Sequence, residues 1–379
     1  MPRRLTSIAW RMKSASVIGT LQPSTFRRGS ATIHGMTLTL SILDQSTIAS
    51  GRGADEAIRE TLALARLADQ LGYHRYWMAE HHNSQSHAGT APEILCAAIA
   101  ATTSRIRIGT AGIMLPHYSA LKVAEQFRVL EAIAPGRIDL GVGRAPGSDG
   151  RTAYALNPDA AQAADRFPQQ VQDLMGWLGD GLPESHPFRM VAANPVIPTR
   201  PAVWILGSSD FGAQLAAYFG LPYCFAHFIT DGRGSEEAMA LYREGFRPHP
   251  GHAGRLAAPQ GAVAAFALAA ATEAEAHRLF QSRALWRLFR DKGVFPPLPT
   301  VEEAEAYPYT PDDLARIERM RARAIIGAPE QVVARLRALA SAHGVEEVAV
   351  LTPCHDAAAR RDSYRLLAEA NAAAMAKAA

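Results

Sequence analysis

The chain has 379 residues, of which 48% are hydrophobic and 20% charged, with 39 Lys and Arg against 36 Asp and Glu. This is the composition of a packed protein, and it excludes a disordered chain. No uninterrupted apolar run reaches the roughly 18 residues of a membrane-spanning helix, so membrane association is not expected. The three cysteines lie far apart, which argues against a disulfide framework and favours a reducing, cytoplasmic compartment.

The net charge of +3 is unevenly distributed along the chain. Residues 1–35 hold six basic and no acidic residues, which leaves 33 basic against 36 acidic residues in 36–379. A basic body that binds nucleic acid is therefore not expected. We interpret 1–35 as a basic N-terminal extension, either a disordered tail or the result of a start codon placed before Met36. A transit peptide is the alternative. The folded domain is expected over 36–379.

From Met36 onward, runs with a β pattern alternate with runs at helical spacing. A first strand at 37–43 precedes a helix at 54–71, which Gly72 ends. The remaining strands are expected at 74–79, 105–115, 137–142, 201–206, 223–227, 262–269 and 347–351. The remaining helices are expected at 91–102, 120–133, 211–219, 235–246, 273–289, 329–343 and 355–370.

Strands that alternate with helices predict a parallel sheet. Eight such units over about 340 residues predict one closed (β/α)8 TIM barrel with insertions. Two segments, 151–199 and 294–310, fit neither pattern, and we interpret them as insertions that cover the mouth of the barrel. Active sites in this architecture lie where the strands end, so the residues that follow each strand are the candidates.

Glu80, His81 and His82 follow the second expected strand. A histidine there can donate a hydrogen bond to a cofactor or act as an acid or base near neutral pH. A metal site with these residues, His87 and His117 is an alternative, although adjacent strand residues point to opposite faces. Loop histidines with structural hydrogen bonds are the third interpretation.

Small residues follow the third and fourth strands. In the run 109–116 they either let a flat ligand approach the backbone or fit the taper of the barrel. The run 141–147 is a poor match to a dinucleotide fingerprint, since it reads GxGxxxG and no helix is expected to open there. Arg144 within it is suited to bind a phosphate in a bidentate manner, or to form a salt bridge at the rim.

The turn 206–212 joins the fifth strand to its helix. Backbone N–H groups at a helix N-terminus, together with the hydroxyls of Ser208 and Ser209, favour an anion site. Ordinary capping by Ser209 or Asp210 is the alternative. The GxSxG elbow of hydrolases fails because Phe211 stands at the last glycine position, and the chain has no Walker A sequence.

Three runs resemble the bacterial luciferase-like monooxygenases in order and spacing. They are Met78-Ala79-Glu80-His81-His82-Asn83, Gly109–Pro116 with Ala124-Glu125-Gln126, and Pro135 to Arg144 (PGRIDLGVGR). The resemblance covers about 36–370 and is greatest to a subgroup with the Gly-Arg-Ala-Pro-Gly loop and the Leu-Gly-Ser-Ser turn.

The resemblance implies a (β/α)8 barrel that binds flavin mononucleotide (FMN) at its mouth. The family's catalytic histidine falls on His81. The family's pair of small residues under the flavin ring, often joined by a non-proline cis peptide, falls on Ala111 and Gly112. Its phosphate-binding arginine falls on Arg144. The phosphate-binding turn falls on Ser208, Ser209 and Gly212. Luciferases proper have a reactive cysteine where this chain has Gly143, which argues against light emission from long aldehydes.

The resulting hypothesis is a flavin-dependent monooxygenase that uses reduced FMN and oxygen on a small organic substrate, with a separate flavin reductase. The alternatives are hydride transfer with the deazaflavin F420, and a flavin-binding protein without turnover. A metal-dependent hydrolase is a more remote option, and no metal is expected. The resemblance also implies a homodimer.

Overall fold

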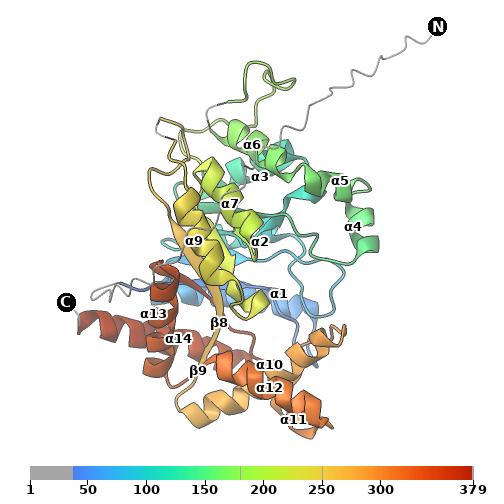
Figure 1. The fold of residues 1–379 in the computed structure, drawn as a ribbon, viewed down its shortest axis with the longest axis vertical. Coiled ribbons are helices and arrows are strands. Elements are labelled where there is room, and N and C mark those ends of the chain that lie inside the picture. The colour runs from blue at the N-terminus through green and yellow to red at the C-terminus, as the bar shows by residue number, and fades with distance from the viewer. Residues whose placement is uncertain (1–36, 180, 250, 378–379) are drawn as a thin grey trace. The chain divides into compact units, whose positions relative to one another are not determined.

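The computed structural model describes residues 37–179, 181–249 and 251–377 (Figure 1). The interpretation of 1–35 as an extension lies outside these residues. The described strands form a closed parallel barrel, because β10 pairs with both β1 and β8. The barrel strands are β1 Thr39–Asp44, β2 Arg75–Met78, β3 Arg107–Thr110, β5 Ile138–Gly143, β6 Ala202–Gly207, β7 Tyr223–Ala226, β8 Gly261–Ala269 and β10 Glu347–Leu351. The prediction of a (β/α)8 TIM barrel is confirmed.

Helices surround the barrel, most of them at the expected places. They are α1 Ala54–Leu71, α2 Pro92–Ala100, α3 Ala120–Ile133, α7 Asp210–Phe219, α9 Ser235–Gly245, α10 Glu273–Asp291, α13 Pro329–His343 and α14 Ala357–Ala376. The insertions add η1 Leu115–His117, α4 Gly150–Leu156, α5 Ala160–Asp165, α6 Phe167–Leu178, α8 His227–Thr230, α11 Val301–Ala306 and α12 Pro311–Arg323.

Three details differ from the expected elements. The strand expected at 105–115 is broken into β3 and β4 (Ile113–Met114), and both pieces pair with β5. His227 does not end a strand but begins α8. A short strand, β9 (Ile325–Gly327), extends the pairing of β8 beyond the barrel. The inserted helices α11 and α12 lie beside α10 in Figure 1, and the three helices pack with the end of β8 and with β9 around a second apolar cluster.

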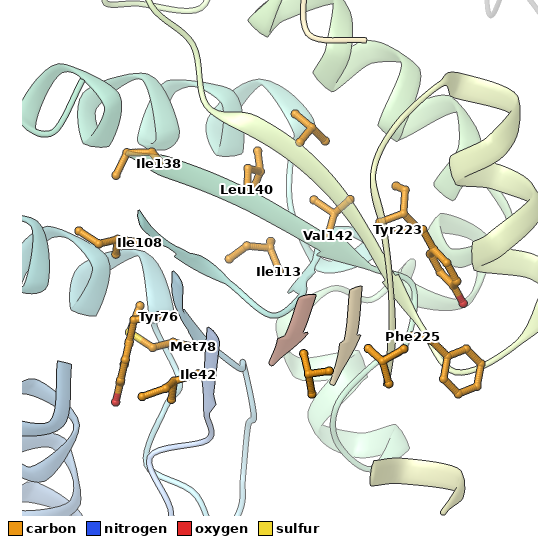
Figure 2. Close-up of a cluster of buried hydrophobic side chains, with 14 of the residues drawn as sticks. Ile42, Tyr76, Met78, Ile108, Ile113, Ile138, Leu140, Val142, Tyr223 and Phe225 are labelled. Atoms are coloured by element: carbon orange, nitrogen blue, oxygen red, sulfur yellow. The ribbon is translucent and has the colours of Figure 1, made fainter. Parts of the chain in front are cut away.

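The main core lies between the barrel and its helices. Strand residues that point outward alternate with residues that point into the barrel. Figure 2 shows the outward set, which includes Ile42, Tyr76, Ile108, Leu140 and Phe225, all fully buried. Burial of this layer supplies the main favourable contribution to folding.

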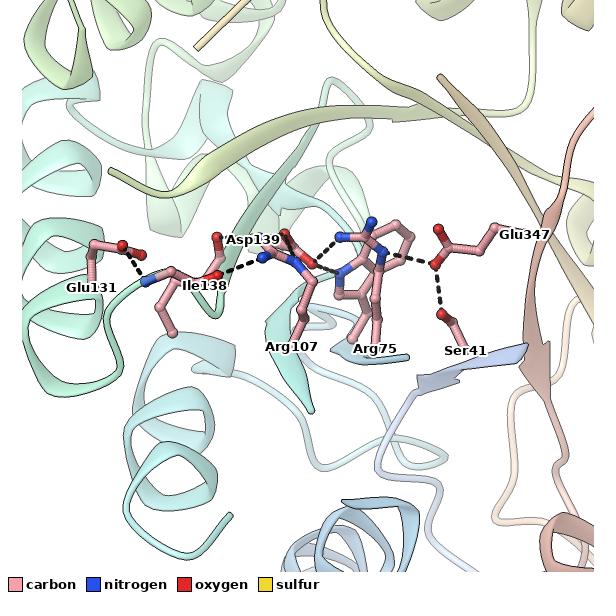
Figure 3. Close-up of polar contacts among 9 residues, drawn as sticks. Ser41, Arg75, Arg107, Glu131, Ile138, Asp139 and Glu347 are labelled. Carbon is pink, nitrogen blue, oxygen red and sulfur yellow. Dashed lines mark hydrogen bonds and ion pairs between the residues drawn. The ribbon is translucent and has the colours of Figure 1, made fainter. Parts of the chain in front are cut away.

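A network of charges fills the barrel interior where its strands begin (Figure 3). Arg75 Nη1 lies 2.8 Å from Asp139 Oδ2, and Arg75 Nε lies 2.8 Å from Glu347 Oε1. Arg107 Nη2 lies 2.6 Å from the other oxygen of Asp139, and Ser41 donates to Glu347. Because each buried charge has a partner, the network closes this end of the barrel without leaving an isolated ion.

Two tryptophans fill the middle of the barrel. The rings of Trp77 and Trp204 pack edge to face with centroids 5.0 Å apart, and Trp77 Nε1 donates to Asp139. The adjacent strands are close together. A Cβ on Gly109 would lie 2.2 Å from the carbonyl oxygen of Asp139, and a Cβ on Gly141 would lie 2.0 Å from the carbonyl oxygen of Thr110. At these two positions glycine therefore serves the packing of β3 against β5.

No helix in the described part of the chain has the length and apolar character needed to span a membrane.

Replacing Asp139 with Asn tests the charge network. The change leaves Arg75 and Arg107 without their shared carboxylate, so we expect denaturant unfolding to show a loss of about 3–5 kcal/mol. The control is Asp55→Asn, which removes an exposed i,i+4 pair with Arg59 and is expected to change nothing measurable. Equal effects of the two variants would contradict this view of the barrel interior.

Candidate active site at the carboxyl ends of the strands

The carboxylate of Glu80, just past β2, ties together the part of the mouth that surrounds it. Glu80 is 2% exposed. Its Oε1 lies 2.7 Å from His82 Nε2 and accepts from the Tyr118 hydroxyl at 2.5 Å. Its Oε2 accepts from the backbone N–H of Met114 at 2.9 Å. Burial and, to a smaller extent, the neighbouring carboxylate of Glu80 raise the pKa of Tyr118 well above its usual range, so the Tyr118 hydroxyl stays a donor. Glu80 therefore orients its neighbours rather than facing a ligand.

His81 has a different environment from that of His82. Its Nδ1 is buried and finds no hydrogen-bond partner in the part of the chain that the structure describes. Its ring stacks on that of His87 with centroids 4.1 Å apart. His87 in turn packs against Trp286 of α10 at 5.5 Å. Burial lowers the pKa of His81 to about 4. The imidazole is therefore neutral near pH 7, which suits a hydrogen-bond donor or acceptor better than an acid that titrates at neutral pH.

Ala111 and Gly112 form the break between β3 and β4. The peptide that joins them is trans, and the cis bond of the described residues is Asn194–Pro195, so the cis peptide suggested by the resemblance is not found here. Gly112 has φ +114°, a conformation that side chains strongly disfavour. A Cβ on the neighbouring Gly143 would come no closer than 3.9 Å to another atom. The backbone at Gly143 therefore leaves free space where a side chain would be, whereas the backbone at Gly109 and Gly141 does not.

Arg144 and the turn before α7 come together across the ends of β5 and β6. The Arg144 guanidinium carbon lies 4.0 Å from the ring centroid of Phe211, in the first turn of α7. Arg144 is exposed and forms no ion pair with any described residue, so the interpretation as a rim salt bridge finds no partner. Ser209, the N-cap, makes no side-chain capping hydrogen bond. An unpaired cation thus lies beside a helix N-terminus whose first N–H groups lack a side-chain cap, which is a suitable arrangement for an anion.

Gly212 is placed by packing. A Cβ there would lie 3.3 Å from Tyr223 Cε2 and 3.6 Å from the Gly207 Cα. Tyr223 also donates to the Ser209 carbonyl oxygen. Gly212 thus lets α7 approach β6 and β7, while its N–H remains in the first turn. Ser208 precedes Ser209 in the same turn and is half-buried.

Asp44, at the end of β1, has a structural environment. Its carboxylate accepts from Arg360 at 2.7 Å, Tyr76 at 2.5 Å and Thr61 at 2.9 Å. Burial alone would raise its pKa, but Arg360 and the two hydroxyls lower it below the usual value. Asp44 thus fastens α14 and α1 to the barrel.

Among the described residues no group of three His, Cys, Asp or Glu side chains is arranged to hold a metal ion. Glu80 binds His82 and Tyr118, while His81 stacks on His87. The three cysteines are free and buried.

Several contacts at the mouth involve residues that sequence reasoning did not select. Tyr118, Phe211 and Trp286 contact Glu80, Arg144 and His87, respectively. Phe211 carried a usable signal, because an aromatic residue in the first turn of a helix beside a candidate phosphate site is positioned to stack on an arginine.

Comparison with known proteins places this site in a family. The model of the luciferase-like monooxygenase family matches residues 37–347. The N-acetyl-S-alkylcysteine monooxygenase of Bacillus subtilis is 36% identical over 340 residues, which is 88% of this chain and 98% of that protein. The chain belongs to the luciferase-like monooxygenase family, and it is an enzyme of that type.

Two solved structures show the same fold. The crystal structure of apo-MsnO8 has a TM-score of 0.79 and 38% identity, and covers 88% of this chain and 98% of that one. The oxygenating constituent of 3,6-diketocamphane monooxygenase from Pseudomonas putida, in complex with FMN, has a TM-score of 0.63 at 19% identity and covers 89% and 98%.

The depressed pKa of His81 predicts a pH dependence of stability. Between its folded pKa of about 4 and the unfolded value of 6.5, the unfolded chain binds the extra proton. The contribution of His81 to the free energy of unfolding is thus fully present above pH 6.5 and is lost as the pH falls towards 4. His81→Asn should reduce this acid loss by about 3 kcal/mol, as measured by unfolding at a series of pH values.

The matched control is His277→Asn on α10, a partly exposed histidine beside Glu273. We expect it to follow the wild-type pH curve. If His81→Asn also followed the wild-type curve, the buried, neutral state of His81 would be refuted.

Proposed function

We propose that the protein is a flavin-dependent monooxygenase that uses reduced FMN and oxygen to oxygenate a small organic substrate, with the reduced flavin supplied by a separate reductase. The observation that carries the proposal is the position of Arg144, which forms no ion pair with a described residue and lies against the first turn of α7. The buried Nδ1 of His81, which has no hydrogen-bond partner among the described residues, lies at the same mouth. The FMN named for the Pseudomonas putida neighbour fits this arrangement.

The residues at the mouth suit the parts of FMN separately. Arg144, Ser208, Ser209 and the first N–H groups of α7, including that of Gly212, would hold the phosphate. The bare backbone around Ala111, Gly112 and Gly143 would lie against the flat ring system. When bound, reduced flavin supplies the electrons and the reactivity towards oxygen.

The protein's own contribution is orientation and proton handling. A neutral His81 can donate or accept a hydrogen bond, or take up a proton, at Nδ1, where no group among the described residues competes for it. Glu80 keeps the segment that bears His81 fixed through Met114 and Tyr118. Stacking on His87 restricts rotation of the His81 ring. α10 packs against this side through Trp286 and would limit the access of water.

Removing the Arg144 side chain tests the phosphate assignment. Arg144→Ala should weaken FMN binding about ten- to a hundredfold, the range expected for a lost hydrogen bond between charged groups. Riboflavin lacks the phosphate, so its affinity should not change. Flavin fluorescence titration measures both.

Arg151→Ala, at an exposed arginine in the nearby α4, is the control and should bind FMN as the wild type does. Equal losses for FMN and riboflavin, or no loss for either, would overturn the phosphate assignment. Titration with F420 in parallel distinguishes the hydride-transfer alternative, since that enzyme would bind F420 in preference to FMN.

The reaction itself is tested by supplying reduced FMN and ¹⁸O₂ to the protein with a metabolite extract and reading the products by mass. We expect a product that carries one labelled oxygen atom, and a rate at least about a hundredfold lower for His81→Asn, the range for the loss of one preorganised hydrogen-bonding group. FMN binding by this variant should persist. A protein that binds FMN but transfers no label would support the flavin-binding alternative without turnover.

A further inference from the structure

We propose that the buried guanidinium of Arg283 forms a subsite for a carboxylate of the substrate, so that the substrate is an organic monoanion. This inference rests on the proposed function, because it names the substrate class of the same mouth. The buried face of a helix such as α10 would ordinarily be apolar. Arg283 and Arg287 are 6% and 7% exposed on that face.

Arg283 is a buried cation that has no carboxylate in ion-pair contact among the described residues. Its guanidinium carbon lies 3.6 Å from the ring centroid of Phe266, and within the described residues its side chain makes no hydrogen bond or ion pair. Its Nε is buried and unpartnered. Burial, with the neighbouring charge of Arg287, lowers the pKa of Arg283 to about 9. A buried arginine left in this state is destabilising unless something supplies the missing negative charge.

The charges around Arg283 leave one cation to be neutralised. Arg287 Nη2 lies 3.3 Å from Asp231 Oδ2 and its Nη1 donates to the Phe228 carbonyl oxygen, so this arginine already has partners. Arg290, further along α10, has an exposed side chain, although partial burial and the charge of Arg287 lower its pKa. With Arg287 paired and Arg290 at the surface, Arg283 is the buried cation of this group that has no ion-pair partner among the described residues. A monoanion balances it, and the planar fork of a guanidinium matches a carboxylate.

The location connects Arg283 to the mouth of the barrel. Phe266 follows Ala262 and Ala264 on the inward face of β8, near the carboxyl end of the strand. Trp286 lies three residues from Arg283, on the same face of α10. Trp286 packs on His87, which stacks on His81. A ligand held by Arg283 would therefore lie on the side of the mouth that bears His81.

Arg283 is separate from the proposed phosphate site. Arg144 and the α7 turn lie at the ends of β5 and β6, whereas Arg283 contacts β8. The aromatic rings of Phe266 and Trp286 beside the cation would contact an apolar part of the same substrate. The surroundings therefore suit an organic acid with an apolar group better than a small inorganic anion.

Two pairs of probes, acetate with acetamide and benzoate with benzamide, test the subsite because each pair differs mainly in charge. Binding to the FMN-loaded full chain is measured by calorimetry at constant ionic strength. We expect at least one acid to bind about tenfold or more tightly than its amide. Arg283→Gln should abolish this difference. Equal affinities of acid and amide in both pairs would overturn the proposal.

Arg278→Gln is the matched control, because Arg278 lies on the same helix but is exposed and paired with Glu275. It should retain the wild-type preference for the acid. Arg283→Lys keeps the charge without the planar fork, and should retain only part of the preference. This second variant keeps the test valid if Arg283→Gln does not fold.

Two further readouts separate this proposal from the proposed function. FMN affinity should be unchanged in Arg283→Gln, and a large loss would assign Arg283 to the cofactor and overturn the substrate subsite. The ligand-free Arg283→Gln protein should melt at the same or a higher temperature than the wild type, since it loses an unpaired buried charge. A clear drop in the melting temperature of Arg283→Gln, together with no preference for the acid in Arg283→Lys, would show that Arg283 serves the fold instead.

Discussion

The carboxylate of Glu80 is the constraint on which the mouth of this barrel depends. It takes the Met114 N–H of the restarted strand β4, the Tyr118 hydroxyl and the His82 ring at the same time. The chain can therefore break at Ala111 and Gly112 without losing the position of the segment that follows. With its neighbours held in this way, His81 keeps a buried Nδ1 that has no hydrogen-bond partner among the described residues.

The two ends of the barrel are built on opposite principles. Where the strands begin, Arg75, Asp139 and Glu347 satisfy one another, and Trp77 and Trp204 fill the space above them. Where the strands end, Gly112 and Gly143 leave bare backbone, and Arg144 has no carboxylate partner within the described ranges. The first end provides stability, whereas the second has exposed backbone and a free positive charge that a ligand could cover and neutralise.

Much of the fold could be predicted from sequence, because α1, α3 and α13 have clear periodicity and end at recognisable signals. The break at Gly112 and the short β9 could not, since each depends on tertiary pairing over two or three residues. At the site, local sequence pointed to Arg144, Ser208 and Ser209, which the fold brings near one another. Local patterns could not predict three contacts that depend on the folded arrangement. These are the stacking of Arg144 on Phe211, the stacking of His81 on His87, and the packing of the Arg283 guanidinium on Phe266.

The central claim is that the carboxyl ends of these strands form a flavin site whose phosphate end is Arg144 and the α7 turn. A crystal structure of the protein with FMN tests it most directly. We predict that the phosphate lies within hydrogen-bonding distance of Arg144 and of Ser208 or Ser209, with the ring system against Gly112 and Gly143 and facing His81. A phosphate bound elsewhere, at Arg283 for example, or a ring system away from His81, would contradict the account.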